Sequence, residues 1–251
     1  MTEIHGVGED PRVSEEYVHR VAGKDGEGDV LLLGVVHDHP SSRHRVKEVV
    51  TGYEPDVLAL EVAPLALSLF EAVALGESWA PTAGDEMSDA IAAAPDARAV
   101  GIDGLDAGFF VTLTRAVYRE RPSLSAVRAL KRSVTAVAKE AVTYRLATVL
   151  GRHTSLRLSV GNPIEHDCDP MDPPAMQAAD ERRQTATSLA FLRSVQLPPQ
   201  LAIRDEVREA CMVRRLERLR QDGDVAAVVG LGHVEPLARE LEGPDGEDPS
   251  F

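Results

Sequence analysis

The sequence predicts an α/β protein with a central mixed, mainly parallel sheet flanked by helices. Short apolar runs of strand length lie near residues 30–36, 57–60, 99–102 and 225–229. Segments with helical patterns separate these runs near both ends of the chain, which is typical of a sheet covered by helices. The middle of the chain, about 107–221, carries helical patterns only. We therefore expect a mostly helical insertion between the early strands and the last one.

The first third of the chain supplies a strand, a turn and a second strand. Residues 17–21 alternate as a strand does, and the Gly-Lys-Asp-Gly turn at 23–26 leads into the apolar run 30–36. Ser41 and Ser42 follow a proline and can cap a helix that runs to about residue 52. Four further elements are expected up to residue 102, a strand at 57–60, helices at about 64–75 and 86–94, and a strand at 99–102.

The second part of the chain is dominated by helices. Their expected positions are about 107–120, 124–150, 175–195 and 200–220. Residues 159–174 contain four prolines and form the clearest loop, while a strand at 225–229 and a helix at about 235–241 complete the domain. We expect a disordered acidic lead at 1–12, a single domain at 13–242 and an acidic tail at 243–251.

The composition limits the function classes. The 251 residues include 41 Asp and Glu against 27 Lys and Arg, a formal net charge of -14, and only four of the basic residues are lysines. Such an acidic field repels phosphates, so nucleic-acid binding is not expected. Abundant carboxylates with little lysine indicate a halophile with an acidic proteome. Without a signal peptide, a membrane-spanning run or a disulfide pattern, the chain is predicted to be soluble and cytoplasmic.

Polar residues of the types that serve in catalysis and metal binding follow four of the predicted strands. The apolar runs end at His37, Glu61, Asp103 and His233. If the strands are parallel, their carboxyl ends share one edge of the sheet, where open α/β folds bind ligands. Polar residues also end strands as ordinary caps and turn formers. The repetition of a Gly-x-x-His frame, at 34–37 and 230–233, favours a functional site over that reading.

Two imidazoles and two carboxylates are compatible with two kinds of chemistry. They can hold a divalent metal (Mn, Co or Zn) with an open position for water, whose pKa the metal lowers. The same groups can also act without metal, with one His or Glu as general base. The dispersed spacing leaves both alternatives open.

Other candidates have ordinary structural explanations beside the functional ones. His39 could add a ligand next to His37, because a His-x-His pair on an extended segment points both rings to one side, or it could be a loop residue. Glu86 sits at a helix start, where its charge suits the helix dipole as well as a site. The acidic cluster at 165–169, which includes Cys168, is expected to be exposed to solvent. Cys211 lies on an apolar helical stripe and is predicted to be a core thiol.

Six short motifs carry a resemblance to a known family. They are Gly34-Val-Val-His37, Pro55-Asp-Val-Leu-Ala-Leu-Glu61, Gly84-Asp-Glu-Met87, Val100-Gly-Ile-Asp103, Arg204-Asp-Glu-Val207 and Val228-Val-Gly-Leu-Gly-His233. Together they resemble the TraB/PrgY family and, more distantly, the Tiki/GumN/erythromycin-esterase group, which share paired GxxH motifs. The chain looks like a haloarchaeal-type member.

The resemblance implies a metal-dependent hydrolase of peptide or amide bonds. It marks His37, Glu61 and His233 as metal or catalytic residues, with Arg204 as an electrostatic helper for the developing oxyanion. The positions of Asp103 and Glu86 in the sequence make them further candidates, as a metal ligand and a catalytic residue respectively. The alternative is a non-catalytic protein that binds a peptide or small ligand in the same cleft. A homodimer through the long insertion helices is compatible with the sequence, although no feature demands it.

Overall fold

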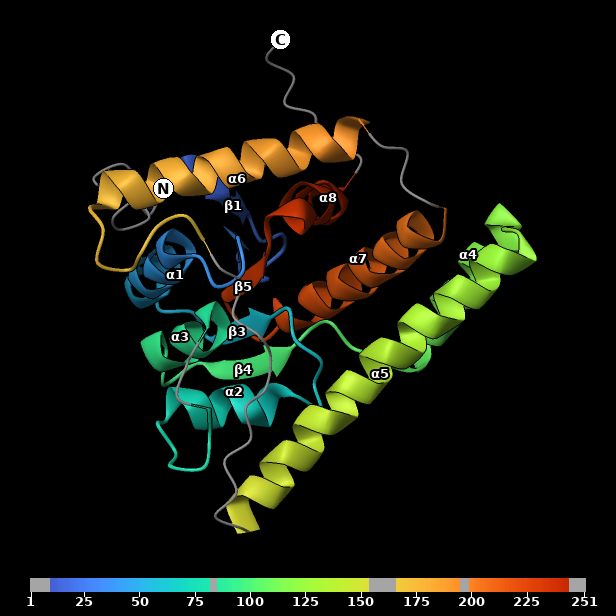
Figure 1. Ribbon diagram of the computed structural model, residues 1–251, viewed down its shortest axis with the longest axis horizontal. Helices are drawn as coiled ribbons and strands as arrows, with labels where there is room; N and C mark the ends of the chain where they lie inside the picture. Colours follow the sequence, from blue (N-terminus) through green and yellow to red (C-terminus); the bar gives the residue numbers. More distant parts are fainter. Residues whose placement is uncertain (1–9, 82–84, 154–165, 195–198, 244–251) are drawn as a thin grey trace.

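The computed structural model describes residues 10–81, 85–153, 166–194 and 199–243 (Figure 1). The expected lead at 1–12 and tail at 243–251 fall almost wholly outside these residues, as does Gly84 of the third motif. Of the Pro-rich segment 159–174, only the part from His166 onward is described.

Five strands of the described residues form one mixed, mostly parallel sheet, which confirms the predicted fold class. The strands are β1 (Val18–Val21), β2 (Val30–Val35), β3 (Val57–Leu60), β4 (Arg98–Gly101) and β5 (Val225–Gly230). Their order is β1-β2-β5-β3-β4, with β1 antiparallel to β2 and the other pairings parallel. The last strand therefore lies in the centre, between the two strands that carry the first two motifs.

Helices cover both faces of the sheet, and their bounds agree with the expected segments to within a few residues. Among the described residues they are α1 (Pro40–Tyr53), α2 (Leu67–Ala74), α3 (Glu86–Ala93), α4 (Ala107–Glu120), α5 (Leu124–His153), α6 (Pro174–Ser194), α7 (Pro199–Leu219) and α8 (Leu231–Glu242), with a 3-10 turn at Glu15–Tyr17. The segment between β4 and β5 is helical, as predicted. None of the helices described is long and apolar enough to cross a membrane.

The alternating side chains of the strands build two separate cores. Leu32, Ala227 and Val229 face α7 and α8, whereas Leu31, Leu33 and neighbouring residues face α1 and α3. Because both faces are covered, the strands β2, β3 and β5 are continuous apolar runs rather than alternating ones. The polar residues that follow these runs are therefore held at the rim of a rigid, dry sheet.

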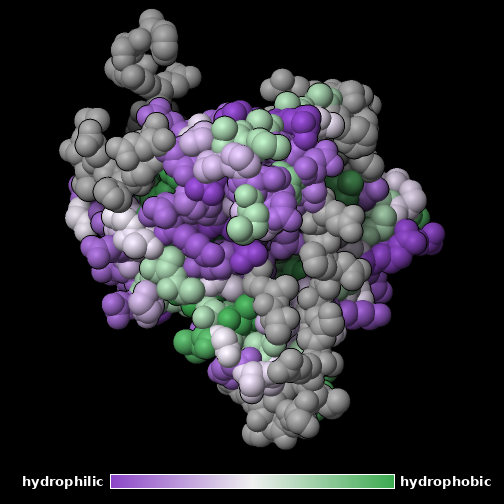
Figure 2. Space-filling model, turned by 60° about the vertical axis from the view of Figure 1, so that its left-hand side comes forward, coloured by the Kyte–Doolittle hydropathy of each residue, from purple (hydrophilic) through white to green (hydrophobic). Residues whose placement is uncertain are grey.

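The insertion has a small core of its own between α4, α5 and α7. Phe109, Leu130, Ile203 and Val207 pack there together with Cys211, which is 3% exposed. The prediction of a core thiol at Cys211 is confirmed. In Figure 1, α4 and α5 extend away from the sheet as a long pair of helices, and Figure 2 shows another face on which hydrophilic residues predominate.

Two local expectations are corrected by the structure. His39, rather than Ser41 or Ser42, caps α1, because its Nδ1 accepts a hydrogen bond from the Ser41 N–H at 3.1 Å. The first expected strand loses Tyr17 to the preceding 3-10 turn, where its ring stacks under the Arg45 guanidinium at 3.9 Å.

Candidate functional site

The carboxyl ends of four parallel strands bring the predicted residues to one edge of the sheet. Glu61 follows β3 directly, while His37 and Asp103 lie two residues beyond β2 and β4. His233 differs from its expected place at a strand end. It lies in the first turn of α8, since β5 ends at Gly230 and the helix begins at Leu231.

The reason for this correction is that the apolar run continues from the strand into the helix. Val234, Leu237 and Leu241 are buried at helical spacing and extend the core on that face of the sheet. A continuous apolar run does not by itself mark where a buried strand gives way to a helix.

Gly230 is the backbone position around which three of the candidates converge. A side-chain carbon placed on Gly230 would lie 3.4 Å from Glu61 Oε2, 3.7 Å from His37 Nε2 and 3.9 Å from His233 Cδ2. The Gly230 N–H also donates to Glu61 Oε2 at 2.6 Å. The two GxxH frames and Glu61 therefore face a common space.

His37 is oriented by the buried carboxylate of Glu86. Its Nδ1 lies 2.6 Å from Glu86 Oε1, and the other carboxylate oxygen accepts the Asp38 N–H at 3.0 Å. The hydrogen bond to Glu86 raises the pKa of His37 to about 9, against the effect of burial. Burial tends to raise the pKa of Glu86, but the contacts with His37 lower it on balance. Glu86 thus contacts a predicted site residue while it occupies the first position of α3.

His233 is oriented in the same manner by a second carboxylate. Its Nδ1 lies 2.8 Å from Glu209 Oε1, and its Nε2 lies 3.4 Å from Glu61 Oε1. Burial lowers the pKa of His233, but the hydrogen bond with Glu209 and the charge of Glu61 outweigh burial and raise it. Each histidine of the paired frames therefore has its Nδ1 on a carboxylate.

Arg208 is the charged residue at the centre of the site, and the sequence reasoning missed it. Its Nη2 donates to Glu61 at 2.6 Å and to Asp103 at 2.8 Å, its Nε donates to Asp103 at 3.1 Å, and its Nη1 lies 3.4 Å from His233 Nε2. Burial opposes its charge, but Asp103 and Glu61 raise the pKa of the guanidinium. In the sequence, Arg208 is one of several charged residues on a helix and resembles an ordinary solvated side chain.

Arg204 lies one helical turn before Arg208 and lines the same cavity. Its guanidinium donates to Asp205 at 2.9 Å and to Ser133 at 3.4 Å. The i to i+4 spacing places both arginines on one face of α7, and this spacing was the available signal for Arg208.

A cavity of about 780 Å³ opens over these residues. One end is charged and holds His37, Glu61, Asp103 and Arg208. The rest is lined largely by apolar side chains from α2, α4 and α5, among them Leu69, Phe70, Val73, Phe109, Val134 and Val137. Its size suits a peptide segment or a small organic molecule.

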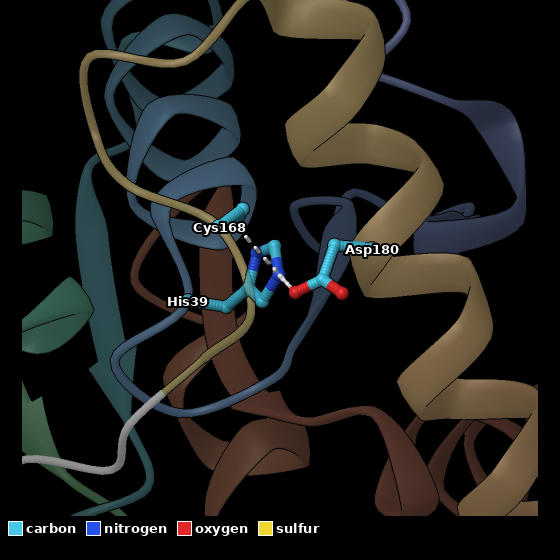
Figure 3. Close-up of side chains that lie close together, drawn as sticks. All are labelled: His39, Cys168 and Asp180. Atoms are coloured by element: carbon cyan, nitrogen blue, oxygen red, sulfur yellow. Dashed lines mark hydrogen bonds and ion pairs between the residues drawn. The ribbon is translucent and has the colours of Figure 1, made fainter.

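A second cluster of polar side chains includes His39, which follows His37 by two residues. His39 Nε2, Cys168 Sγ and an Asp180 carboxylate oxygen all lie within 4.8 Å of one another, and the three side chains point toward one another in Figure 3. This group could hold a metal ion. It joins the turn after β2, the segment before α6 and α6 itself (Figure 3).

The position of His39 departs from the expected His-x-His arrangement. Asp38 adopts a left-handed conformation with φ 61°, so the segment is not extended. The His37 side chain is 51% exposed, whereas that of His39 is completely buried. Burial lowers the pKa of His39. The two rings consequently belong to two different clusters.

The expected exposure of the acidic cluster around Cys168 holds for only part of it. Asp167 and Asp169 are exposed, and Glu165 lies outside the described residues. Cys168 is partly buried with its Sγ 3.6 Å from His39 Nε2, and burial, together with the nearby Asp180, raises the pKa of its thiol to about 11. His166 packs edge-on against His39 and bonds the backbone oxygen of His37 at 3.0 Å.

No family model, curated protein or solved structure matches the chain.

Proposed function

We propose that the chain is a metal-dependent hydrolase that cleaves peptide or amide bonds of a ligand bound in the cavity. One observation carries the proposal. Two histidines from distant motifs have their Nδ1 atoms on carboxylates, and both lie with Glu61 within 4 Å of a side-chain carbon placed on Gly230. Metal-binding histidines commonly donate one ring N–H to a carboxylate, which fixes the ring and leaves the other nitrogen for the metal.

The donor set suits a divalent ion. In this proposal His37 Nε2, His233 Nε2 and Glu61 are the ligands, which leaves a position for water or substrate. Glu86 and Glu209 hold the rings in orientation from behind. The chemistry that such an ion supplies is a lowered pKa for water and polarisation of the substrate carbonyl.

Arg208 has a separate role in this proposal. A guanidinium and a divalent ion compete for the same carboxylate oxygen, so metal loading requires Arg208 to release Glu61. Asp103 still holds the guanidinium through two hydrogen bonds, at 2.8 and 3.1 Å. A donor of Arg208 is then available at the edge of the site for the negative charge that develops on the substrate oxygen. We assign this role to Arg208 rather than to Arg204.

A second candidate function is the non-catalytic binding of a peptide or small ligand in the same cavity. The specific observation in its favour is that Arg208 already forms ion pairs with both Glu61 and Asp103. Both carboxylates therefore have a cationic partner without an added metal ion, as they would in a passive recognition site.

Manganese binding tests the proposal, because Mn²⁺ favours carboxylate and imidazole ligands over thiolates and so avoids Cys168. The chain is stripped with a chelator and titrated with Mn²⁺, with electron paramagnetic resonance reporting the free ion. We expect stoichiometric binding in the wild type that is lost in Glu61→Gln and His233→Ala. His19→Ala is the matched control. His19 is a partly exposed histidine on β1 that is bonded to Glu242, and it does not line the cavity.

Hydrolysis is then measured on a mixture of peptides by mass spectrometry, with and without Mn²⁺. Metal-dependent cleavage that Arg208→Met greatly reduces supports the hydrolase. Absence of Mn²⁺ binding overturns the metal-dependent proposal. Peptide binding without cleavage supports the non-catalytic candidate instead.

A further inference from the structure

We propose that His39, Cys168 and Asp180 form a zinc site that fastens the segment before α6, and α6 itself, to the turn that carries His37. The site is separate from the proposed hydrolytic centre and does not depend on it. Within the part of the chain that the structure describes, these three ligand atoms lie within 4.8 Å of one another.

Two of the three ligand separations match those of tetrahedral zinc, and the one between nitrogen and oxygen is long for a hydrogen bond. His39 Nε2 lies 3.4 Å from Asp180 Oδ2 and 3.6 Å from Cys168 Sγ. An N–H···O hydrogen bond is normally about 2.9 Å long. In contrast, zinc bonds of about 2.0–2.3 Å place tetrahedral ligands about 3.3–3.8 Å apart. His39 Nε2 therefore already lies at the distances from Asp180 and Cys168 that a shared zinc ion requires.

The ligand types select zinc among common divalent ions. A thiolate disfavours Mg²⁺ and Mn²⁺, while Cys, His and Asp side chains are each used as ligands of zinc. The surroundings support the ligands in the way that outer partners of metal sites do. Arg183 bonds one oxygen of Asp180, and Gln184 Nε2 donates to the other at 3.0 Å.

The protons balance as follows. Without metal, His39 Nδ1 accepts the Ser41 N–H, so the ring proton lies on Nε2. On zinc binding, the Cys168 thiol proton goes to solvent and the ring proton moves to Nδ1, which gives up the Ser41 hydrogen bond. Bonds from zinc to His39 Nε2, Cys168 Sγ and the Asp180 carboxylate would replace the contacts that these groups now make with one another.

The position of the site gives the ion a structural purpose. His39 lies 129 residues before Cys168 and 141 before Asp180 in the chain, so one ion would join the turn after β2 to two neighbouring segments far along the chain. His166, two residues before Cys168, already bonds the His37 backbone oxygen at 3.0 Å. Zinc at His39 would thus fix the same turn that presents His37 to the cavity.

Cobalt substitution provides the test, because only thiolate ligation gives an intense charge-transfer band in the near ultraviolet. The full chain is stripped of metal and titrated with Co²⁺. We expect the band in the wild type and in Cys211→Ser, and its loss in Cys168→Ser and Cys168→Ala. Zn²⁺ should raise the melting temperature of the wild type and of Cys211→Ser, but not of the Cys168 variants.

Two results would overturn the zinc site: no band in the wild type, or a band that survives in both Cys168 variants. Folding of each variant is checked by circular dichroism, and if a Cys168 variant fails to fold, the titration of Cys211→Ser, whose only thiol is Cys168, decides. The proposed hydrolytic centre contains no sulfur, so its Mn²⁺ binding should persist in Cys168→Ser. Failure of one site is therefore distinguishable from failure of the other.

Discussion

His37 and His39 are separated by one residue, yet they occupy opposite environments. The His37 ring is half exposed, lies in an open cavity and has its pKa raised to about 9 by Glu86. The His39 ring is fully buried, caps α1 and has its pKa lowered by burial. The left-handed Asp38 between them turns the chain so that the rings diverge. Environment, rather than residue type or spacing, therefore separates the partly exposed His37, which is paired with a carboxylate, from the buried His39, which caps a helix.

The largest effect is expected from the buried ion pair that adjoins His39. Arg45 and Glu181 are both buried and joined by several hydrogen bonds, one of them 3.1 Å long, and Ser42 donates to Glu181 at 2.5 Å. Glu181→Ala leaves Arg45 buried without its partner, so we expect a loss of about 3–5 kcal/mol in the free energy of unfolding. Urea denaturation measures it.

The control for this prediction is an exposed pair on α8. Glu235 and Arg239 are 83% and 71% exposed, so Glu235→Ala should change stability by less than about 1 kcal/mol. Equal losses of stability in the two variants would contradict the prediction that the buried Arg45–Glu181 pair stabilises the fold more than an exposed pair does.

A smaller effect separates the two histidines themselves. His39→Ala removes the cap of α1, whereas His39→Asn retains a side-chain acceptor at that position. We expect His39→Ala to be less stable than His39→Asn by about 1 kcal/mol. His37→Ala should be less destabilising than His39→Ala, because the His37 ring is half exposed. Thermal and urea unfolding of the three variants decide the order, and equal losses would contradict the comparison.

The sequence predicted the parts of the molecule that depend on local pattern. The strand runs and the residues at their ends led to His37, Glu61 and Asp103, because a parallel sheet places all its carboxyl ends at one edge. It could not distinguish Arg208 from Arg204, since residues one helical turn apart are equivalent until the packing of α7 is known. Asp180 and Glu181 were missed because α6 is rich in charged and polar residues throughout, and only contact with α1 shows which of them are buried.

The contribution of His37, the partly exposed histidine of the two, to the stability of the fold depends on pH. The folded-state pKa of His37, about 9, lies above its ordinary value of 6.5. Its contribution to stability is thus fully present below about pH 6.5 and is lost as the pH rises through about 9. Glu86→Gln removes the partner charge, so the pKa of His37 should fall toward its ordinary value. The stability should then decline less steeply between pH 6.5 and 9.

Histidine NMR resonances followed from pH 5 to 10 measure this shift directly. His233 provides an internal control, because its raised pKa depends on Glu209 and Glu61 rather than on Glu86. A His37 pKa that is unchanged in Glu86→Gln would contradict the assignment of Glu86 as the cause.

The smallest change in stability is expected for Gly230→Ala. The first glycines of the two GxxH frames, Gly34 and Gly230, should differ in how well they accept a methyl group. Neither glycine has a positive φ, so each is required, if at all, for space rather than for an unusual turn. A methyl group on Gly34 would lie 2.7 Å from Leu231 Cδ1 and 3.0 Å from Val234 Cγ2, so Gly34→Ala must at least displace these side chains of α8. A methyl group on Gly230 would meet Glu61 at 3.4 Å, an ordinary contact distance. Gly230→Ala should therefore alter the free energy of unfolding by no more than about 0.5 kcal/mol.

The added methyl group of Gly230→Ala nevertheless lies in the space between His37 and Glu61, so Mn²⁺ affinity should fall. Unaltered Mn²⁺ affinity in a folded Gly230→Ala would place the metal elsewhere than at the convergence of the two frames.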